Sequence, residues 1–422
     1  MRIVWYCVDP VGAEMAGPGI RAVELSRRLA GRHEVTLVAP GATTLQDSER
    51  LARAEPDALV AALHGADAFV TQGFDFPLRS LLRFHGRLVL DLYDPVQLEQ
   101  LAQFGPAPTP AQRVSLAHVR ARLLVLLRRA DHVLCASPEQ RIFWLGWLGA
   151  AGRLAPGTLA GDPEARRLVA VVPFGMPEAP PRRDGQPLRS AIGASAGDRV
   201  ALFWGGMWDW MDPALAVRAA GLLAAAEHPI HLALLAGERP GGAVMRAAAD
   251  EARRAAAELR LERRVHFLER WVPYAERGAV LLDADVAVTA HKPSLEAELA
   301  FRTRLLDCLW ARLPAACTRG DALAAEAERA GWGGAAQAGD AEGLAAVIAS
   351  LLDPAANARA REAAAAAAER YRWSRSADAV LALLDAPPAP RPHALVPGEA
   401  AGERIGRVAR AFGAKVIGRL RK

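Results

Sequence analysis

The sequence is poor in cysteine and contains no long apolar run. Its four cysteines are Cys7, Cys135, Cys308 and Cys317, which stand far apart and form no CxxC pair. Each lies in or beside an apolar stretch, so we expect buried free thiols in a reducing, cytoplasmic compartment. No apolar run reaches the roughly 18–20 residues that a membrane-spanning helix needs.

Other expected signals are also missing. The amino-terminal stretch MRIVWYCVDP is too short and too quickly polar for a signal peptide. No group of His, Asp and Glu has the spacing of metal ligands, so we expect no metal cofactor. Apolar residues make up 52% of the chain and charged residues 23%, a globular composition. At 422 residues the chain exceeds one ordinary core, and we expect two domains.

Positive charge is concentrated at the carboxyl terminus. Residues 403–422 hold seven Arg or Lys and one Glu, whereas the net charge of the whole chain is only +5. The rest of the chain is therefore close to neutral, and we expect no nucleic-acid partner.

The basic tail has two interpretations. Its apolar residues recur at three- and four-residue spacing, as in a helix that lies on an anionic membrane surface and would hold the protein at the inner face of the membrane. Three glycines weaken the helix, and a solvated, partly disordered end fits equally. The apolar residues are Ile405, Val408, Phe412, Val416 and Leu420.

Short β-rich runs alternate with helical patterns in two successive series, which predicts two doubly wound α/β domains with parallel sheets. Ligands of such sheets bind beyond the carboxyl ends of the strands, here expected in the cleft between the domains. The predicted strands are 2–8, 34–39, 68–72, 87–92, 132–136 and 169–173, then 199–203, 231–235, 265–268, 285–289 and 315–318.

A segment rich in Pro and Gly marks a predicted domain boundary in the chain. The stretch PFGMPEAPPRRDGQP reads as a linker. A long helical pattern is predicted over Ala363–Asp385, and its last part could return to the first domain. The predicted divisions are 1–175 (first Rossmann-like domain), 176–190 (linker), 191–370 (second Rossmann-like domain), 371–385 (carboxyl-terminal helix) and 386–422 (Pro-rich spacer and tail).

In each predicted domain, a glycine-containing loop follows the first predicted strand. In the first domain, Gly17, Pro18 and Gly19 stand at the start of a predicted helix, followed by Arg21. Small residues and a positive charge at a helix start would let a phosphate or acceptor bind there, and an ordinary loop before a helix explains the pattern equally well. The glycines do not match GxGxxG, which argues against a nicotinamide site. In the second, Gly205–Gly206 directly follow a strand, so a ligand could rest against bare backbone.

Carboxylates and cations gather at two predicted strand ends. Asp91 and Asp94 end a strand in LVLDLYDP, where a carboxylate can orient hydroxyls or act as a base; capping by Asp94 is the alternative. The richer segment is 291–321, in which charged groups precede an apolar helix and predict an anion site. Its candidates are His291, Lys292, Glu298, Arg302, Arg304 and Asp307.

Several motifs in order resemble the retaining glycosyltransferases of family 4, which have the two-Rossmann-domain GT-B fold. The resemblance runs from Met1 to Asp385. The motifs are the GPGIR loop, SPEQ at 137–140, VPFG at 172–175, the glycines at 205–206, and LLDCLWARLP at 305–314.

The resemblance implies roles for single residues. Asp307 matches the acidic residue that hydrogen-bonds the ribose of a nucleotide sugar. A family Glu that contacts the sugar would fall on Leu299, so Glu298 serves only if the loop bulges by one residue. Trp271 and Val272 lie where the family meets the nucleotide base.

The diphosphate contacts depart from the family. The Arg and Lys that usually follow the second-domain glycines have no counterpart in MWDWMDP. Arg302 and Arg304 are the substitutes we expect, because a guanidinium suits a diphosphate, with His291 and Lys292 assisting.

These features predict a cytoplasmic hexosyltransferase that moves a sugar from a nucleotide sugar to a glycan or lipid-linked acceptor, as in cell-envelope polysaccharide synthesis. By resemblance it would retain configuration and need no metal. Two alternatives stay open. One is a nucleotide-sugar 2-epimerase, and the other is a catalytically silent relative that binds a nucleotide sugar or a partner.

Overall fold

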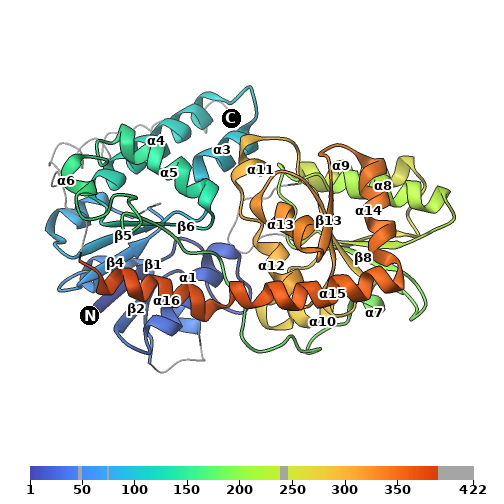
Figure 1. Ribbon diagram of the computed structural model, residues 1–422, viewed down its shortest axis with the longest axis horizontal. Helices are drawn as coiled ribbons and strands as arrows, with labels where there is room; N and C mark the ends of the chain where they lie inside the picture. Colours follow the sequence, from blue (N-terminus) through green and yellow to red (C-terminus); the bar gives the residue numbers. More distant parts are fainter. Residues whose placement is uncertain (46–49, 74–75, 238–245, 388–422) are drawn as a thin grey trace, which may run out of the picture. The chain divides into compact units, whose positions relative to one another are not determined.

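The computed structural model describes residues 1–45, 50–73, 76–237 and 246–387 (Figure 1). The chain divides into two compact units. Unit 1 comprises Met1–Val11, Pro18–Pro173 and the residues from Ala377 onward, and unit 2 comprises Gly12–Gly17 and Phe174–Ser376. The predicted amphipathic tail, 403–422, lies outside the described residues.

Unit 1 is built on a parallel sheet of seven strands over the described residues, in the order β3-β2-β1-β4-β5-β6-β7. The order reverses between β1 and β4, as in a doubly wound Rossmann-like fold. The strands are β1 (Arg2–Tyr6), β2 (Glu34–Val38), β3 (Ala52–Ala54), β4 (Ala68–Thr71), β5 (Arg87–Asp91), β6 (His132–Cys135) and β7 (Val169–Val171).

Helices connect the strands of unit 1. The α-helices are α1 (Gly17–Leu29), α2 (Leu59–Ala62), α3 (Val96–Phe104), α4 (Pro110–Arg129), α5 (Pro138–Ala150) and α6 (Pro156–Leu159), and the 3₁₀ turns are η1 (Ala42–Thr44), η2 (Pro56–Ala58) and η3 (Leu78–Arg83). The best-capped is α4, where Thr109 and Gln112 form a reciprocal capping box.

Unit 2 repeats the architecture with a parallel six-stranded sheet in the order β10-β9-β8-β11-β12-β13, again counted over the described residues. Here the order reverses between β8 and β11. The strands are β8 (Val200–Phe203), β9 (His231–Leu235), β10 (Val265–Leu268), β11 (Val286–Thr289), β12 (Ala315–Thr318) and β13 (Gly333–Ala336).

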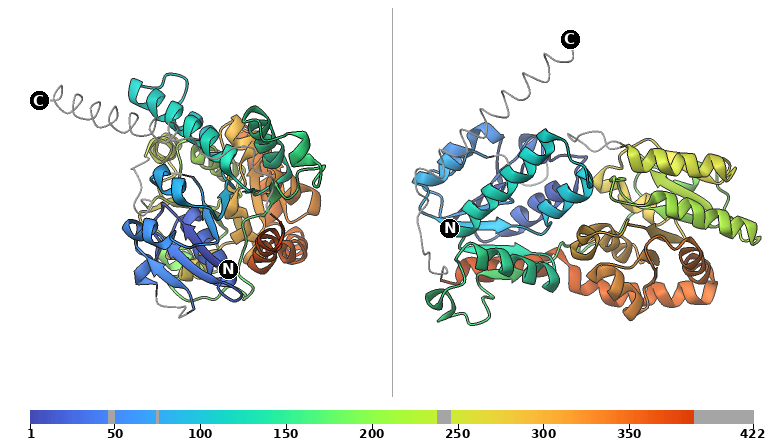
Figure 2. Two further views of the ribbon diagram at one scale, coloured as in Figure 1. Left: turned by 90° about the vertical axis from the view of Figure 1, so that its left-hand side faces the viewer. Right: turned by 90° about the horizontal axis from the view of Figure 1, so that it is seen from above.

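The helices of unit 2 cover its sheet. Helix α8 packs against α9, beside which it lies in Figure 2, and against α14. The α-helices are α7 (Leu188–Ile192), α8 (Pro213–Ala225), α9 (Ala247–Glu258), α10 (Arg277–Leu281), α11 (Leu295–Leu299), α12 (Thr303–Trp310), α13 (Ala322–Ala330), α14 (Ala341–Leu352) and α15 (Pro354–Ala368), with 3₁₀ turns η4 (Tyr274–Glu276) and η5 (Glu369–Tyr371).

Every predicted strand is present within two residues of its expected bounds, but the long helix predicted over Ala363–Asp385 is wrong. Helix α15 ends at Ala368, and α16 (Trp373–Asp385) begins after an extended Arg372. The backbone here pairs with another segment: Met176 N–H donates to Tyr371 O at 2.7 Å and Trp373 N–H to Met176 O at 3.0 Å. These bonds replace the intrahelical bonds that a continuous helix would need.

The predicted linker packs along unit 2. Trp310 Nε1 donates to Ala179 O at 2.7 Å, and Arg189 Nη2 contacts Asp285 at 2.8 Å. Arg372 Nη1 donates to Pro177 O at 2.6 Å. These contacts explain why unit 2 begins at Phe174.

Candidate functional site

The carboxyl end of β8 carries a glycine pair where the strand order of the unit 2 sheet reverses. The chain leaves β8 through Trp204, Gly205 and Gly206. Ligands of doubly wound sheets bind outside the carboxyl ends of the strands at such a switch point. Gly205 adopts a φ of 85°, and a Cβ there would lie 3.4 Å from the guanidinium of Arg304. Glycine therefore suits this turn for its conformation and for the close approach.

Arg304 lies beneath the glycine loop. Its Nη1 donates to Trp204 O at 2.8 Å and its Nη2 to Gly206 O at 3.2 Å. Burial, with the nearby charge of Arg302, lowers the pKa of Arg304 to about 10, so the group stays protonated at neutral pH. The positive charge of Arg304 therefore lies against the carbonyl groups of this loop, where it would also stabilise an anion bound at the loop.

Asp307, one turn along α12 from Arg304, is held by two donors. Trp204 Nε1 donates to Oδ2 at 3.0 Å, and Arg277 Nε donates to Oδ1 at 3.0 Å. The Asp307 side chain keeps 26% of its surface exposed, whereas that of Arg277 keeps 6%. Its carboxylate is therefore fixed in direction but still accessible.

Aromatic side chains surround this pair of residues. The Arg277 guanidinium lies 3.7 Å from the centroid of the Tyr274 ring and 4.2 Å from that of Trp310. It also donates to the Tyr274 carbonyl. Two ring faces and two acceptor contacts leave the guanidinium little freedom to move.

Trp271 and Val272 follow β10 and lie beside the same loop. A Cβ on Gly206 would come within 3.1 Å of the Trp271 indole and 3.8 Å of Trp208. Val272 is buried in unit 2. Trp271 therefore borders the glycine loop, and its predicted contact with a base stays a prediction.

At the carboxyl end of β11, His291 and Lys292 face different surroundings. His291 is 3% exposed, and its Nδ1 has no hydrogen-bond partner among the described residues. Burial lowers the pKa of His291 well below its usual value, with Arg302 and Arg304 adding to the effect, so the imidazole is neutral. Lys292 instead pairs with Glu251, Nζ to Oε2 at 3.1 Å. Of these two residues, His291 is the one that is buried near Arg302 and Arg304.

Arg302 does not share the place of Arg304. Its Nε lies 2.6 Å from Asp321 Oδ2, with the two side chains 1% and 0% exposed, and its Nη1 donates to Thr318 O at 2.6 Å. Asp321 also caps α13 by accepting from Leu323 and Ala324. This burial gives Arg302 a structural partner. Its predicted contact with a donor stays a prediction, and the geometry favours Arg304 instead.

The acidic residues of α11 point to different surroundings. Glu298 is exposed, whereas Glu296 is 5% exposed and close enough to Arg304 to raise its pKa. Residues two apart on a helix do not face the same side. The inward carboxylate of this segment is therefore Glu296, which the sequence did not single out.

In unit 1, Arg21 and Asp91 are paired with each other. Arg21 is fully buried, and its Nε and Nη2 contact the Asp91 carboxylate at 2.8 to 3.0 Å. Its other bonds go to the carbonyls of Pro173, at 2.9 Å, and Val172, at 3.0 Å. The pair ties α1 to the ends of β5 and β7. The catalytic role of Asp91 and the phosphate role of Arg21 remain untested predictions, and this pairing favours a structural task.

Two other predicted features of unit 1 lie near this pair. Gly17, Pro18 and Gly19 form the first turn of α1, as expected. Asp94, beyond β5, keeps partial exposure. Desolvation raises the pKa of Asp94 well above its usual value, and Glu99 adds to the rise. Burial therefore favours the protonated form of the Asp94 carboxyl group.

The residues that the sequence analysis missed are Arg277, Tyr274, Trp310 and Glu296. A signal was present for three of them: Trp310 lies three residues after Asp307 in α12, and Tyr274 lies three residues before Arg277, a spacing at which helical side chains are neighbours. The contact between the two pairs spans thirty residues of sequence. It depends on the tertiary fold and left no local pattern.

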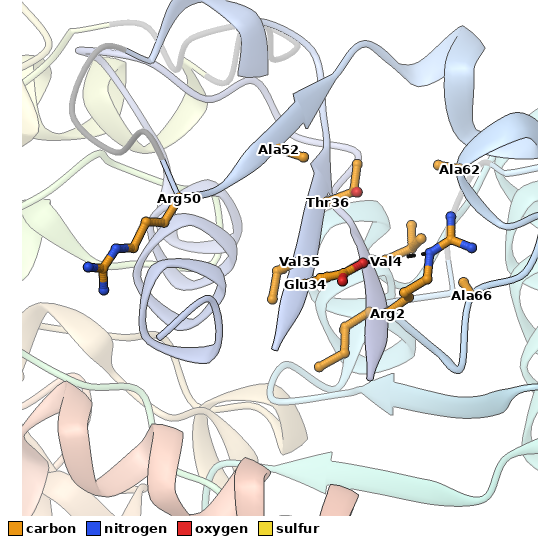
Figure 3. Close-up of a pocket in the computed structure, with 10 residues that line it drawn as sticks. Arg2, Val4, Glu34, Val35, Thr36, Arg50, Ala52, Ala62 and Ala66 are labelled. Carbon is orange, nitrogen blue, oxygen red and sulfur yellow. Dashed lines mark ion pairs between the residues drawn. The ribbon is translucent and has the colours of Figure 1, made fainter. Parts of the chain in front are cut away.

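A separate cavity of about 290 Å³ lies at the amino ends of β1, β2 and β3 in unit 1. Figure 3 shows Arg2 and Glu34, two of its lining residues, joined by an ion pair of 4.0 Å, while the Arg50 guanidinium points away from them. The Arg2 and Glu34 side chains are 58% and 84% exposed. This hollow lies at the opposite end of the strands from the predicted site residues.

Within residues 1–45, 50–73, 76–237 and 246–387, no helix is both long and apolar enough to cross a membrane. The same ranges hold no group of three or more His, Cys, Asp or Glu side chains that could bind a metal ion.

No protein-family model matches the sequence, and no curated protein matches it. Solved structures match nearly its whole length. Sucrose-phosphate synthase from Thermosynechococcus elongatus matches with a TM-score of 0.64 and 18% identity, covering 90% of this chain and 97% of that one. Anabaena HepE in complex with UDP-glucose matches with 0.64 and 17%, covering 90% and 98%.

A third match is WaaG, a glycosyltransferase involved in lipopolysaccharide biosynthesis, with a TM-score of 0.62 and 14% identity over 91% of this chain and 100% of that one. At these identities the likeness concerns the fold. Together with the two parallel sheets it confirms the predicted fold class: the chain has the α/β GT-B fold, with two Rossmann-like domains.

Proposed function

We propose that this protein is a nucleotide-sugar-dependent glycosyltransferase that transfers a hexosyl group to a glycan or lipid-linked glycan. The observation that carries the proposal is the arrangement at the β8 switch point, where Arg304 lies under a bare glycine loop and Asp307 presents a fixed carboxylate. Support also comes from the GT-B fold shared with Anabaena HepE in its UDP-glucose complex.

The donor half of the reaction needs stabilisation of a leaving diphosphate. Breaking the sugar–phosphate bond places negative charge on the diphosphate and positive charge on the sugar ring. In the proposed site the amide groups of Gly205–Gly206 and the charge of Arg304 receive the diphosphate, and Asp307 accepts from the ribose hydroxyls. Neutral His291 can hydrogen-bond the sugar without adding cationic charge beside the developing oxocarbenium centre.

The acceptor half is assigned to unit 1. Asp94, whose pKa is raised by burial, is the proposed acid–base or orienting group for the acceptor hydroxyl. We propose retention of configuration, with the acceptor attacking from the leaving-group side, and stabilisation by protein groups without a metal. A cytoplasmic enzyme peripheral to an anionic membrane would suit a lipid-linked acceptor.

The test is a thermal-shift panel of UDP, GDP, dTDP and CDP, followed by turnover of the matching nucleotide sugars with and without EDTA. We expect one diphosphate to raise the melting temperature and its sugar conjugate to be turned over unaffected by the chelator. In Arg304→Ala and in Asp307→Ala, the diphosphate should no longer raise the melting temperature and the nucleotide sugar should no longer be turned over. Arg319→Ala is the matched control, because that guanidinium pairs with Glu328 on the surface of unit 2.

One observation favours a second candidate, a catalytically silent relative. Arg302 is bound by Asp321, and the MWDWMDP loop carries no cation, so among the described residues the cation that contacts the glycine loop is Arg304. Nucleoside diphosphate binding without turnover of any nucleotide sugar would favour this candidate. A protein that binds none of the four diphosphates would refute both.

A further inference from the structure

Arg277 and Trp204 each donate one hydrogen bond to the carboxylate of Asp307, the residue proposed to bind the nucleotide. Asp307 Oδ1 accepts from Arg277 Nε at 3.0 Å, and Oδ2 accepts from Trp204 Nε1 at 3.0 Å. Each carboxylate oxygen can accept about two hydrogen bonds, so each keeps roughly one lone pair for another donor. With 26% of the Asp307 side chain exposed, those lone pairs are open to a ligand.

The partner of Asp307, Arg277, is held by several contacts of its own. The Arg277 guanidinium lies over the ring of Tyr274, 3.7 Å from its centroid, and over that of Trp310, 4.2 Å from its centroid. Trp310 is itself tied to Ala179 O through Nε1 at 2.7 Å. A free aspartate rotates about two side-chain bonds, whereas one that is hydrogen-bonded to a clamped guanidinium and to an indole keeps a single orientation.

We propose that Arg277 is a positioning residue that makes the nucleotide site selective for a ribose diol. This inference rests on the proposed function, because it assumes that a nucleoside diphosphate binds beside Asp307. Two neighbouring hydroxyls can donate one hydrogen bond to each carboxylate oxygen only if the carboxylate plane faces them. Arg277 fixes that plane, and a sugar without the hydroxyls leaves the desolvated carboxylate underpaired.

The experiment measures dissociation constants by calorimetry for UDP, GDP, CDP and ADP and for their 2′,3′-dideoxy counterparts. The wild-type protein should prefer the ribose form by about tenfold or more, the ratio expected from hydrogen bonds to a charged group. In Arg277→Met, which keeps an apolar stem against the rings, the preference should fall below about threefold, while binding of the dideoxy form stays nearly unchanged. Asp307→Ala should show the same loss of preference.

Two further variants separate positioning from folding. Arg277→Lys keeps the charge but not the planar fork, so it should bind with an intermediate preference and keeps the test available if Arg277→Met is unstable. Arg253→Met is the matched control. Its guanidinium also covers a ring, that of Phe267 at 4.3 Å, and also pairs with a carboxylate, Glu269, but it does not contact Asp307. Its preference should equal that of the wild type.

The outcomes are distinct. An unchanged ribose preference in both Arg277 variants, or an equal weakening of ribose and dideoxy forms, would overturn the positioning role while leaving the proposed function intact. Failure of the wild-type protein to bind any of the eight nucleotides would instead refute the proposed function, and the inference with it.

Discussion

Replacing Asp91 by Ala should destabilise unit 1 far more than an ordinary loss of charge. Asp91 is 2% exposed and is the only carboxylate that contacts the Arg21 guanidinium among the described residues, through distances of 2.8 to 3.0 Å. Without it, a fully buried cation keeps only two carbonyl partners. Removing one partner of a buried ion pair typically costs about 3–5 kcal/mol, a large part of the roughly 5–15 kcal/mol that stabilises a domain.

The assay must report on unit 1 by itself. Hydrogen–deuterium exchange of peptides from β1 and β5 does so, because their core amides exchange through opening of this unit. Asp91→Ala should speed their exchange by about a hundredfold or more, as expected for a loss of this size. Glu164→Ala is the control, because the ion pair between Glu164 and Arg166 has side chains that are 66% and 74% exposed. Its exchange should hardly change.

A double variant, Arg21→Met with Asp91→Leu, distinguishes structure from catalysis. Replacing both members of a buried pair by apolar residues of similar size is often neutral, so most of the stability should return. If Asp91 only supports the fold, nucleotide-sugar turnover should return as well. The reasoning fails if Asp91→Ala behaves like Glu164→Ala, and the structural assignment fails if the refolded double variant has no turnover.

Three other predictions concern unit 2. Gly205→Ala should cost about 1–3 kcal/mol in urea unfolding, because its φ of 85° is unfavourable for a side chain; no loss would contradict the loop conformation. Asp321→Ala should lower the melting temperature more than Asp340→Ala, since Asp340 only caps a helix whereas Asp321 also belongs to a buried ion pair; equal shifts would contradict this. Burial lowers the pKa of His231 and His266, whose ring nitrogens contact each other at 2.9 Å. As the pH falls, these histidines therefore bind protons more readily in the unfolded chain than in the folded one, and the stability of the folded protein should fall below about pH 6.5. Urea midpoints at pH 7.5 and 5.5 test this, and His266→Gln should reduce the difference.

Most of the fold could be predicted because its strands are apolar and bounded by turn residues. Strands such as β1 and β8 are buried along nearly their whole length and read as continuous apolar runs. Strands β3, with the sequence ARA, and β13, with GGAA, were missed. They contain no β-branched residue, and their conformation comes from pairing with β2 and β12.

The candidate site could be predicted in part for a similar reason. Gly205 and Asp307 stand out locally, as a glycine after a strand and an acid in an apolar helix. Arg302 and Arg304 looked interchangeable in sequence, but residues two apart at a helix start face different sides. One guanidinium therefore meets Asp321 and the other the glycine loop. The contact of Arg277 with Asp307 depends on the tertiary fold alone.

The central claim is that unit 2 binds a nucleoside diphosphate at the end of β8. A crystal structure of the full chain with the diphosphate that gives the largest thermal shift tests it most directly. We predict phosphate oxygens within hydrogen-bond distance of the Gly205 or Gly206 amide and ribose hydroxyls on Asp307. A nucleotide bound elsewhere, such as the hollow lined by Arg2 and Glu34, with the β8 loop empty, would contradict the account.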